Sequence, residues 1–243
     1  MTTLIEWDAG ALAADGATVV GTVNVVDLGD YDAAEFPQDI SAAAYTYWNT
    51  AAASQYSARF YFHTPAVAWP DAAAAIFSAW VGGTHLGGIN VAGVGAPGQL
   101  RWKTAFSTEA FRSGNGIIDL ADIYRVEIQT DGIAGTMRGA VFDLQSDTAL
   151  YDSGVQPKSV GAAVTRFHFG RITAQASLRT FGISRVKVVD TVGPWVGRHA
   201  TDIIPETAPE MMGVWNGSAL DDGEILGVWT GTDLVPTDAI FFN

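Results

Sequence analysis

Alternating apolar and polar side chains form the strongest pattern in this chain, and residues 57–63 show it most clearly. An extended backbone sends successive side chains to opposite sides, so every second residue shares one side. The apolar side holds Ala58, Phe60 and Phe62, and the other side holds Arg59, Tyr61 and His63. The segment is therefore predicted to be a half-buried β-strand whose apolar side faces a core.

Further segments share this alternation or are rich in β-branched residues. They are residues 18–26, 76–81, 86–91, 99–104, 124–129, 140–144, 165–169 and 183–189. The three segments between residues 76 and 104 are joined by short glycine-rich turns, which is typical of a β-meander. No long amphipathic helix is found, so the many short strands predict an all-β sandwich or barrel.

Three segments are less regular. Residues 42–56 are rich in alanine and fit a helix or a strand, and we favour a strand because the next segment is one. Residues 27–40 are acidic and contain Pro37, which predicts a loop. Pro70 precedes an alanine run at residues 72–75, which favours a single helical turn.

The strand pattern ends at residues 192–195, and the composition changes beyond that point. Pro205 and Pro209 favour extended backbone before them, so residues 196–210 are predicted to be a linker. The main domain is then a sandwich over residues 1–195, with an extension over residues 211–243.

The extension contains an internal repeat. Gly-Val-Trp-x-Gly begins at residue 213 and again at residue 227, and each copy predicts a strand, a tight turn and a returning strand. Two small hairpins cannot bury Trp215 and Trp229 by themselves. We therefore expect the extension to pack on the sandwich, on another subunit or on a different protein.

Charge is unevenly distributed along the 243 residues, whose formal net charge is −13. All thirteen Lys and Arg residues lie within residues 59–198, and the segments on either side hold eight acids each and no base. Nucleic-acid binding needs a basic footprint, so this balance argues against it. The acidic ends favour either simple solubility or contact with a basic partner surface such as a neighbouring subunit.

Seven basic residues occupy the polar sides of the predicted strands. They are Arg59, Arg101, Lys103, Arg125, Arg166, Arg185 and Lys187. Long basic side chains often cover apolar sheet surface while their charges stay in water, and we favour this over a dedicated anion or glycan site. The apolar runs are too short for a membrane span, and residues 1–6 do not resemble a secretory signal, so we expect a soluble protein folded in a cytoplasm.

Catalytic and metal-binding patterns are weak. The chain has no cysteine, which excludes disulfides, thiolate zinc sites and cysteine nucleophiles. The four histidines show no metal-ligand spacing, and no strand pairs two carboxylates as a glycoside hydrolase would need. The glycine-rich residues 93–98 match a dinucleotide-loop pattern but lead into a strand, so a hairpin loop is favoured. We therefore expect no enzyme activity and no cofactor.

Asp27, Asp30 and Asp32 raise a calcium alternative in the predicted loop. They lack the glycine and terminal glutamate of an EF-hand loop, so a solvated turn is favoured and no metal ligand is assigned.

Several of these segments together resemble concanavalin A-like (laminin G-like) jelly rolls in minor tail proteins of actinobacteriophages. The resemblance covers roughly residues 15–195 and is carried by Phe60-Tyr61-Phe62, the meander through Trp80 and Trp102, residues 124–127, residues 167–170 and residues 186–194. The repeated Gly-Val-Trp-x-Gly hairpins resemble C-terminal extensions of similar virion proteins. The resemblance implies an antiparallel jelly-roll sandwich in a non-enzymatic virion protein of the tail tip or fibre, made in the host cytoplasm.

The same resemblance implies other virion proteins and a homo-oligomer, most simply a trimer, as partners. A capsid decoration protein and a glycan-processing hydrolase are the alternatives. Host cell-wall carbohydrate is a further expected partner, because Arg59, Tyr61 and His63 put an aromatic ring between hydrogen-bonding groups. Trp215 and Trp229 complete the candidate contact residues. The favoured alternative to a carbohydrate contact on this strand is that another layer of protein covers Tyr61 and that His63 only ends the strand.

Overall fold

The computed structural model describes residues 2–28, 31–37, 43–66, 68–105, 108–144, 146–158, 161–172 and 179–199, and the backbone of residues 227–229 and 234–236. The chain divides into two compact units, Met1–His199 and Ala200–Asn243. Each unit is described by itself below, and the first is called the sandwich unit.

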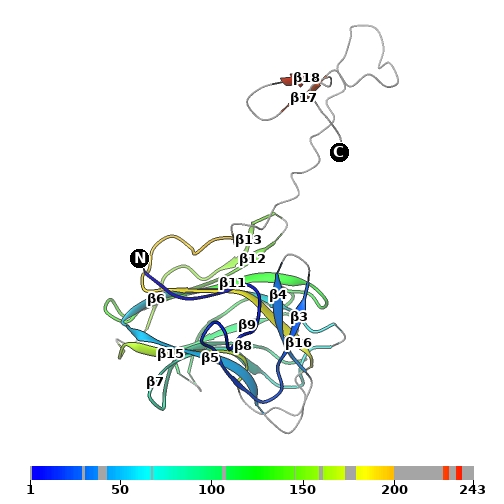
Figure 1. Ribbon diagram of the computed structural model, residues 1–243. Coiled ribbons are helices and arrows are strands. Elements are labelled where there is room, and N and C mark those ends of the chain that lie inside the picture. Colours follow the sequence, from blue (N-terminus) through cyan, green and yellow to red (C-terminus); the bar gives the residue numbers. More distant parts are fainter. Residues whose placement is uncertain are drawn as a thin grey trace. The chain divides into compact units, whose positions relative to one another are not determined.

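The sandwich unit contains two antiparallel sheets that pack face to face, as Figure 1 shows. The order of the nine-stranded sheet is β13-β12-β11-β6-β16-β4-β3, with β1 paired to β16 and β14 paired to β12. Its strands are β1 (Thr3–Trp7), β3 (Asn24–Asp27), β4 (Asp32–Phe36), β6 (Gln55–His63), β11 (Ile123–Asp131), β12 (Thr136–Asp143), β13 (Ala149–Asp152), β14 (Gln156–Pro157) and β16 (Phe181–Val189).

The order of the seven-stranded sheet is β10-β9-β8-β7-β15-β5-β2. Its strands are β2 (Thr18–Val20), β5 (Ala44–Ala53), β7 (Ala74–Val81), β8 (Thr84–Val91), β9 (Leu100–Lys103), β10 (Glu109–Arg112) and β15 (Val164–Arg171). The consecutive antiparallel strands β7, β8, β9 and β10 form the predicted meander. The all-β, antiparallel jelly-roll sandwich expected from the sequence is confirmed.

The core lies between the two sheets and is built by the predicted alternation. Phe60 of β6 contacts Phe77 of β7 and Phe169 of β15, with ring centroids 5.9 and 5.7 Å apart. Phe62 packs edge-on against Phe181 of β16. Each of these rings is almost completely buried, and full burial of such a side chain contributes about 1.5–3 kcal/mol.

The structure corrects the expectation of a single early strand over residues 18–26. The chain forms β2 in one sheet and β3 in the other, with a break at Gly21. Gly21 has φ 73°, and a Cβ there would lie 2.4 Å from the carbonyl oxygen of Ala43. Only glycine fits this crossing between the sheets without strain.

Two other local expectations are also wrong. The predicted loop over residues 27–40 contains β4, which pairs with β3 and with β16 because both neighbours offer backbone partners. The predicted helical turn at residues 72–75 is instead the approach to β7, whose first residue Ala74 pairs with Val91 of β8. In both cases sheet pairing overrides a weak local preference.

The second unit contains an antiparallel hairpin of β17 (Gly227–Trp229) and β18 (Leu234–Pro236). This confirms the two paired strands predicted for the second repeat and the hairpin extension of the fold-class prediction, and the predicted turn at residues 230–233 lies outside the described residues. The first repeat, residues 213–220, lies outside the described residues. Among the residues that are described, no helix has the length and apolar character needed to cross a membrane.

Candidate functional site

Arg59, Tyr61 and His63, the candidate carbohydrate contacts of β6, lie on the outer side of the nine-stranded sheet. Other parts of the protein cover most of this side of β6. Residues 191–199, here called the covering segment, run back over β6 and β11. Arg59 is 2% exposed and Tyr61 is 1% exposed. The Tyr61 hydroxyl accepts a hydrogen bond from the backbone N–H of His199 at 3.1 Å, and Arg59 Nη1 donates to the carbonyl of Gly197 at 3.1 Å.

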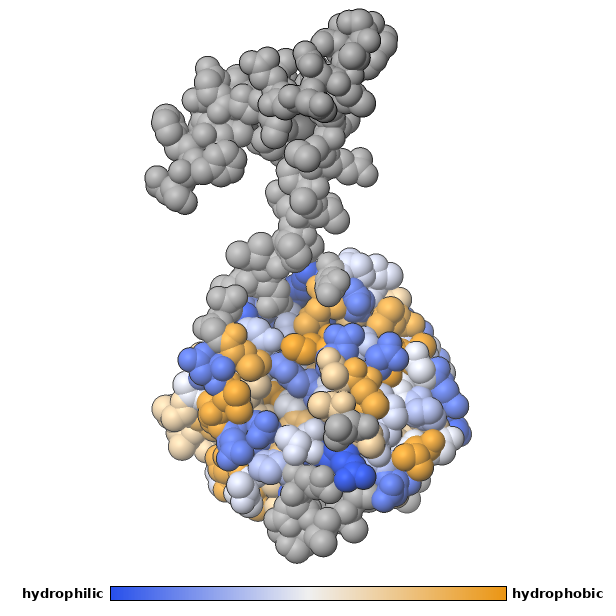
Figure 2. Space-filling model, turned by 90° about the vertical axis from the view of Figure 1, so that its right-hand side faces the viewer, coloured by the Kyte–Doolittle hydropathy of each residue, from blue (hydrophilic) through white to orange (hydrophobic). Residues whose placement is uncertain are grey.

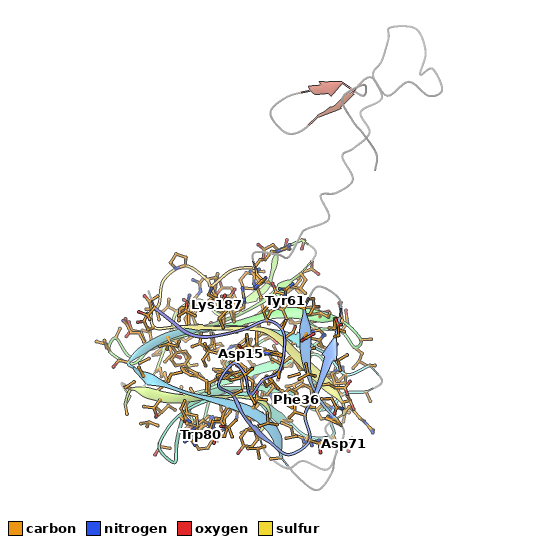
Figure 3. All side chains as sticks on the ribbon, viewed as in Figure 1. Asp15, Phe36, Tyr61, Asp71, Trp80 and Lys187 are labelled. Atoms are coloured by element: carbon orange, nitrogen blue, oxygen red, sulfur yellow. The ribbon has the colours of Figure 1, made fainter. Side chains whose placement is uncertain are left out.

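Arg59 and Tyr61 are therefore not exposed as a carbohydrate contact would require. The favoured alternative, in which another layer of protein covers Tyr61, describes the structure. It also shows that residues 196–199, assigned to the linker from the sequence, pack on the sandwich. Figure 3 shows Tyr61 on the outer side of the upper sheet.

Glu127 of β11 holds the centre of the covering segment. Its carboxylate is fully buried and accepts the backbone N–H groups of Val196 at 2.6 Å and Gly197 at 3.0 Å. Arg125 Nε lies 3.0 Å from the same carboxylate, and Arg125 also pairs with Asp147. Burial raises the pKa of Glu127 to about 7, although Arg125 and the two N–H groups favour the charged form.

Arg185 of β16 joins the N-terminal part of the unit to the end of the covering segment. Its Nη1 donates to Asp8 Oδ1 at 2.6 Å and lies 2.7 Å from His199 Nδ1. A guanidinium only donates, so His199 Nδ1 is the acceptor. Arg185 has φ 51° at a register shift between β16 and β6. Three chain segments therefore meet at one buried cation.

His63 is the last residue of β6 and lines a cavity of about 270 Å³ at the edge of the sandwich. The cavity is lined by Val26, Leu28, Ala33, Glu35, His63, Thr64, Ala66, Arg179, Thr180, Phe181 and Gly182. His63 Nε2 lies 2.7 Å from Ser184 Oγ, and burial lowers the pKa of His63 to about 4. Figure 2 views the molecule from the side where Figure 1 places β3 and β4, and apolar and polar residues are interspersed there.

The remaining predicted contact residues belong to the second unit. Trp215 lies outside the described residues. Trp229 ends β17, of which the structure describes only the backbone, so its side-chain contacts stay a prediction.

No calcium-like arrangement is present among the described residues, in which no cluster of three His, Asp or Glu side chains suits a metal ion. Asp27 and Asp32 face each other across the β3–β4 pair, and Asp30 lies outside the described residues. Asp32 Oδ2 accepts the backbone N–H of Gly10 at 2.5 Å.

Sequence reasoning missed an aromatic row on the outer side of the seven-stranded sheet. The aromatic row consists of Tyr45, Tyr47, Trp80, His85 and His168. The His168 ring stacks between Tyr45 and Trp80, with centroids 5.0 and 5.3 Å away, and Tyr47 lies 5.2 Å from it. His85 meets Trp80 edge-on at 5.3 Å. Figure 3 shows Trp80 on the side of its sheet opposite the core.

Hydrogen-bonding groups flank the aromatic row. Trp80 Nε1 donates to Ser78 Oγ at 2.6 Å, and Arg166 Nε donates to Asn49 Oδ1 at 2.8 Å. The Arg166 guanidinium lies 4.7 Å from the centroid of the Tyr47 ring. Apart from the buried His168, the row is half-buried, so it combines accessible rings with polar groups on one face.

One signal in the sequence pointed toward the row. Arg166 is predicted on the polar side of the alternating segment 165–169, and His168, two residues further on, shares that side in the structure. Tyr45 and Tyr47 also share one side of β5, but their meeting with His168 depends on the β5–β15 pairing.

Comparison with known proteins supports the fold. No protein-family model matches this chain, and no curated protein sequence does. Among solved structures, a sialidase matches with a TM-score of 0.54 and 11% identity, over 79% of this chain and 19% of the sialidase chain. The binding domain of botulinum neurotoxin DC in complex with SialylT matches with a TM-score of 0.53 and 10% identity, over 72% of this chain and 42% of that one.

A third structure concerns botulinum neurotoxin type C, whose cell entry depends on interaction with two ganglioside molecules. It matches with a TM-score of 0.52 and 8% identity, over 77% of this chain and 44% of the toxin chain. This chain therefore spans less than half of each of these three neighbours. At such low identities the likeness establishes a shared β-sandwich fold.

Proposed function

We propose that the sandwich unit is a non-enzymatic carbohydrate-binding module and that the aromatic row is its contact surface. The observation that carries this proposal is the clustering of Tyr47, Trp80 and their ring neighbours beside polar side chains on an outer sheet face. Binding sites for small polar ligands combine apolar and aromatic surface with a few well-placed hydrogen-bonding groups. Asn49 and Arg166 supply such groups next to the rings.

The structural neighbours support the same class of function. One neighbour is a botulinum neurotoxin binding domain in complex with SialylT, and another concerns a botulinum neurotoxin whose cell entry depends on two ganglioside molecules. The site on this chain is argued from its own residues, because the likeness of sequence is low.

We also propose that the module belongs to a minor tail protein of an actinobacteriophage virion, made in the host cytoplasm. Residues 15–195 resemble the jelly rolls of such tail proteins, and the Gly-Val-Trp-x-Gly repeats resemble the C-terminal extensions of similar virion proteins, which supports a role in the phage tail. Host cell-wall carbohydrate, other virion proteins and identical subunits in a trimer are the proposed partners. A capsid decoration protein is the alternative within the same class.

A glycan-processing hydrolase is the alternative from another class, and its support is the likeness to sialidase structures. Acid–base hydrolysis of glycosides uses two carboxylates on either side of the scissile bond. The described cavity has one, that of Glu35, whose Oε1 accepts a hydrogen bond from Asn24 at 3.2 Å. Glu127 is buried under the covering segment, so it cannot reach a substrate. These contacts favour binding over hydrolysis.

The test is calorimetric titration of the full chain with cell-wall polysaccharide from a panel of actinobacteria. Trp80→Ala and Tyr47→Ala should each lower the affinity about tenfold, because an aromatic contact contributes roughly 0.5–1.5 kcal/mol beyond its buried area. Trp80→Phe keeps a ring and should retain part of the affinity. Trp195→Ala, at a half-buried tryptophan that contacts Phe142 and Arg138 of the nine-stranded sheet, is the matched control and should bind normally.

Melting curves would verify that each variant is folded. Equal binding by the parent chain, Trp80→Ala and Tyr47→Ala would refute the assigned surface. Absence of binding to every polysaccharide in the panel would refute the function itself.

A further inference from the structure

The seven-stranded sheet is cationic although the protein as a whole is strongly acidic. Its strands contain five Lys or Arg residues and one acid, in a chain whose net charge is −13. The five bases are Arg101, Lys103, Arg112, Arg166 and Arg171, and the acid is Glu109. Glu109 already pairs with Arg112 at 2.6 Å and lies 3.8 Å from Arg101. Arg171 is 1% exposed and donates to the Pro37 carbonyl, so the accessible charge of this sheet comes from the other four bases and Glu109.

Arg166 and Lys103 carry this charge next to the aromatic row. Arg166 pairs with Trp80 across the β15–β7 register, and its contacts are the Tyr47 ring and the neutral Asn49 amide. Lys103 pairs with Gly88 of β8 on one side and with Glu109 of β10 on the other, and the Glu109 carboxylate forms its ion pairs with Arg112 and Arg101. Within the described part of the chain, neither Arg166 nor Lys103 forms an ion pair with a carboxylate.

Arg166 and Lys103 lie on β15 and β9, with β7 and β8 between them. Cross-strand pairing places Tyr47, His168, Ser78, Gly88 and Lys103 in one line over five neighbouring strands. Four strand spacings of about 4.8 Å give this line a length of about 19 Å. Such a length suits several sugar units of an extended polysaccharide rather than one small molecule.

The histidines of the row do not add to its charge at neutral pH. Burial, with Arg166 and His85 nearby, lowers the pKa of His168 to about 4. Burial, with Lys103 nearby, lowers the pKa of His85 to about 4. Both rings are therefore neutral near pH 7, and the positive field that they experience comes from Arg166 and Lys103.

We propose that the aromatic row binds an anionic polysaccharide, with Arg166 and Lys103 pairing with its carboxylate or phosphate groups while the rings contact its sugars. This inference rests on the proposed carbohydrate-binding function and names its ligand class. A guanidinium suits carboxylate and phosphate geometry alike, so both groups share this chemistry. A neutral polysaccharide would leave both cations of the face without a counter-charge.

The test uses wall polysaccharide from the same actinobacterial panel, separated by anion exchange into an anionic and a neutral fraction. Affinity of the full chain for each fraction is measured by calorimetry at low and at high salt. The anionic fraction should bind at least about tenfold more tightly, and salt should weaken it, because paired charges are screened. Removing phosphodiesters with hydrofluoric acid, or reducing carboxylates, identifies which of the two groups is bound.

Two variants and one control connect the result to the residues. Arg166→Gln and Lys103→Gln should each lower the affinity for the anionic fraction about tenfold. Lys187→Gln makes the same change on the outer side of the other sheet, where Figure 3 shows Lys187, and should bind like the parent chain.

The outcomes separate this inference from the proposed function. If the neutral fraction binds equally well and Arg166→Gln has no effect, while Trp80→Ala abolishes binding, the anionic ligand is refuted and the carbohydrate module stands. If neither fraction binds, both proposals fail. Selective loss with Arg166→Gln and Lys103→Gln, and not with Lys187→Gln, supports the anionic ligand.

Discussion

Glu127 offers the sharpest test of the covered outer face, because one buried carboxylate attaches the covering segment to the sheet. Truncation by Glu127→Ala removes the acceptor of the Val196 and Gly197 N–H groups and one partner of Arg125. Removing one member of a buried, hydrogen-bonded charge pair costs about 3–5 kcal/mol. We expect a loss of this size in the free energy of unfolding, measured by urea denaturation of the full chain at pH 7.

The conservative variant Glu127→Gln adds a pH dependence with a definite sign. The pKa of Glu127 is raised from 4.5 to about 7 in the folded protein, so the folded state holds this proton more tightly than the unfolded state. The resulting stability is fully present below pH 4.5 and is lost as the pH rises through 7. Linkage gives a loss of about 2.5 kcal/mol between pH 5 and pH 8. Glu127→Gln cannot titrate and should lack this component.

Glu6→Gln is the matched control, because Glu6 pairs with Lys187 at 2.8 Å at the surface of the same sheet. An exposed pair contributes at most about 1 kcal/mol, so this variant should be close to the parent chain. Hydrogen exchange provides a local readout, since the amides of Val196 and Gly197 should exchange faster in Glu127→Ala. Equal stabilities of Glu127→Ala and Glu6→Gln, with unchanged exchange at both amides, would contradict the assigned role.

Two further predictions concern the same unit. Because burial lowers the pKa of His63 from 6.5 to about 4, stability from the neutral ring is present above pH 6.5 and is lost as the pH falls toward 4. The stability difference between the parent chain and His63→Gln should therefore narrow by about 2 kcal/mol from pH 7 to pH 5 in urea denaturation, and a constant difference would argue against a buried neutral ring. Deleting residues 205–243 should leave the melting temperature of the sandwich nearly unchanged, since the unit that contains both large sheets ends at His199; an unfolded product would place the extension in the main core.

Much of the fold was predictable because strong alternation encodes strands directly. In β6 the alternating Phe60 and Phe62 predict both the strand and the side of it that faces the core. Their packing on Phe77 and Phe181 agrees with that prediction. β4 gave no such signal, because its buried Ala33 and Ala34 are small and lie next to acids. Its strand conformation is set by pairing with β3 and β16, which lie far apart in sequence.

The sandwich crossing at Gly21 was hidden for a related reason. Residues 18–26 are β-branched throughout most of their length, so local propensity favours one uninterrupted strand. The break depends on the close approach of Ala43, and a window of neighbouring residues contains no information about it.

The candidate site shows where local patterns stop being informative. Alternation correctly places Tyr61 and His168 on outer sides of their strands, yet Tyr61 is covered and the neighbours of His168 form an accessible row. The difference is made by a distant carboxylate, because Glu127 captures two backbone N–H groups of a segment about seventy positions further along the chain. An outer strand position is therefore open to a ligand only where no other segment of the chain covers it, and the half-buried rings of Tyr47 and Trp80 meet that condition.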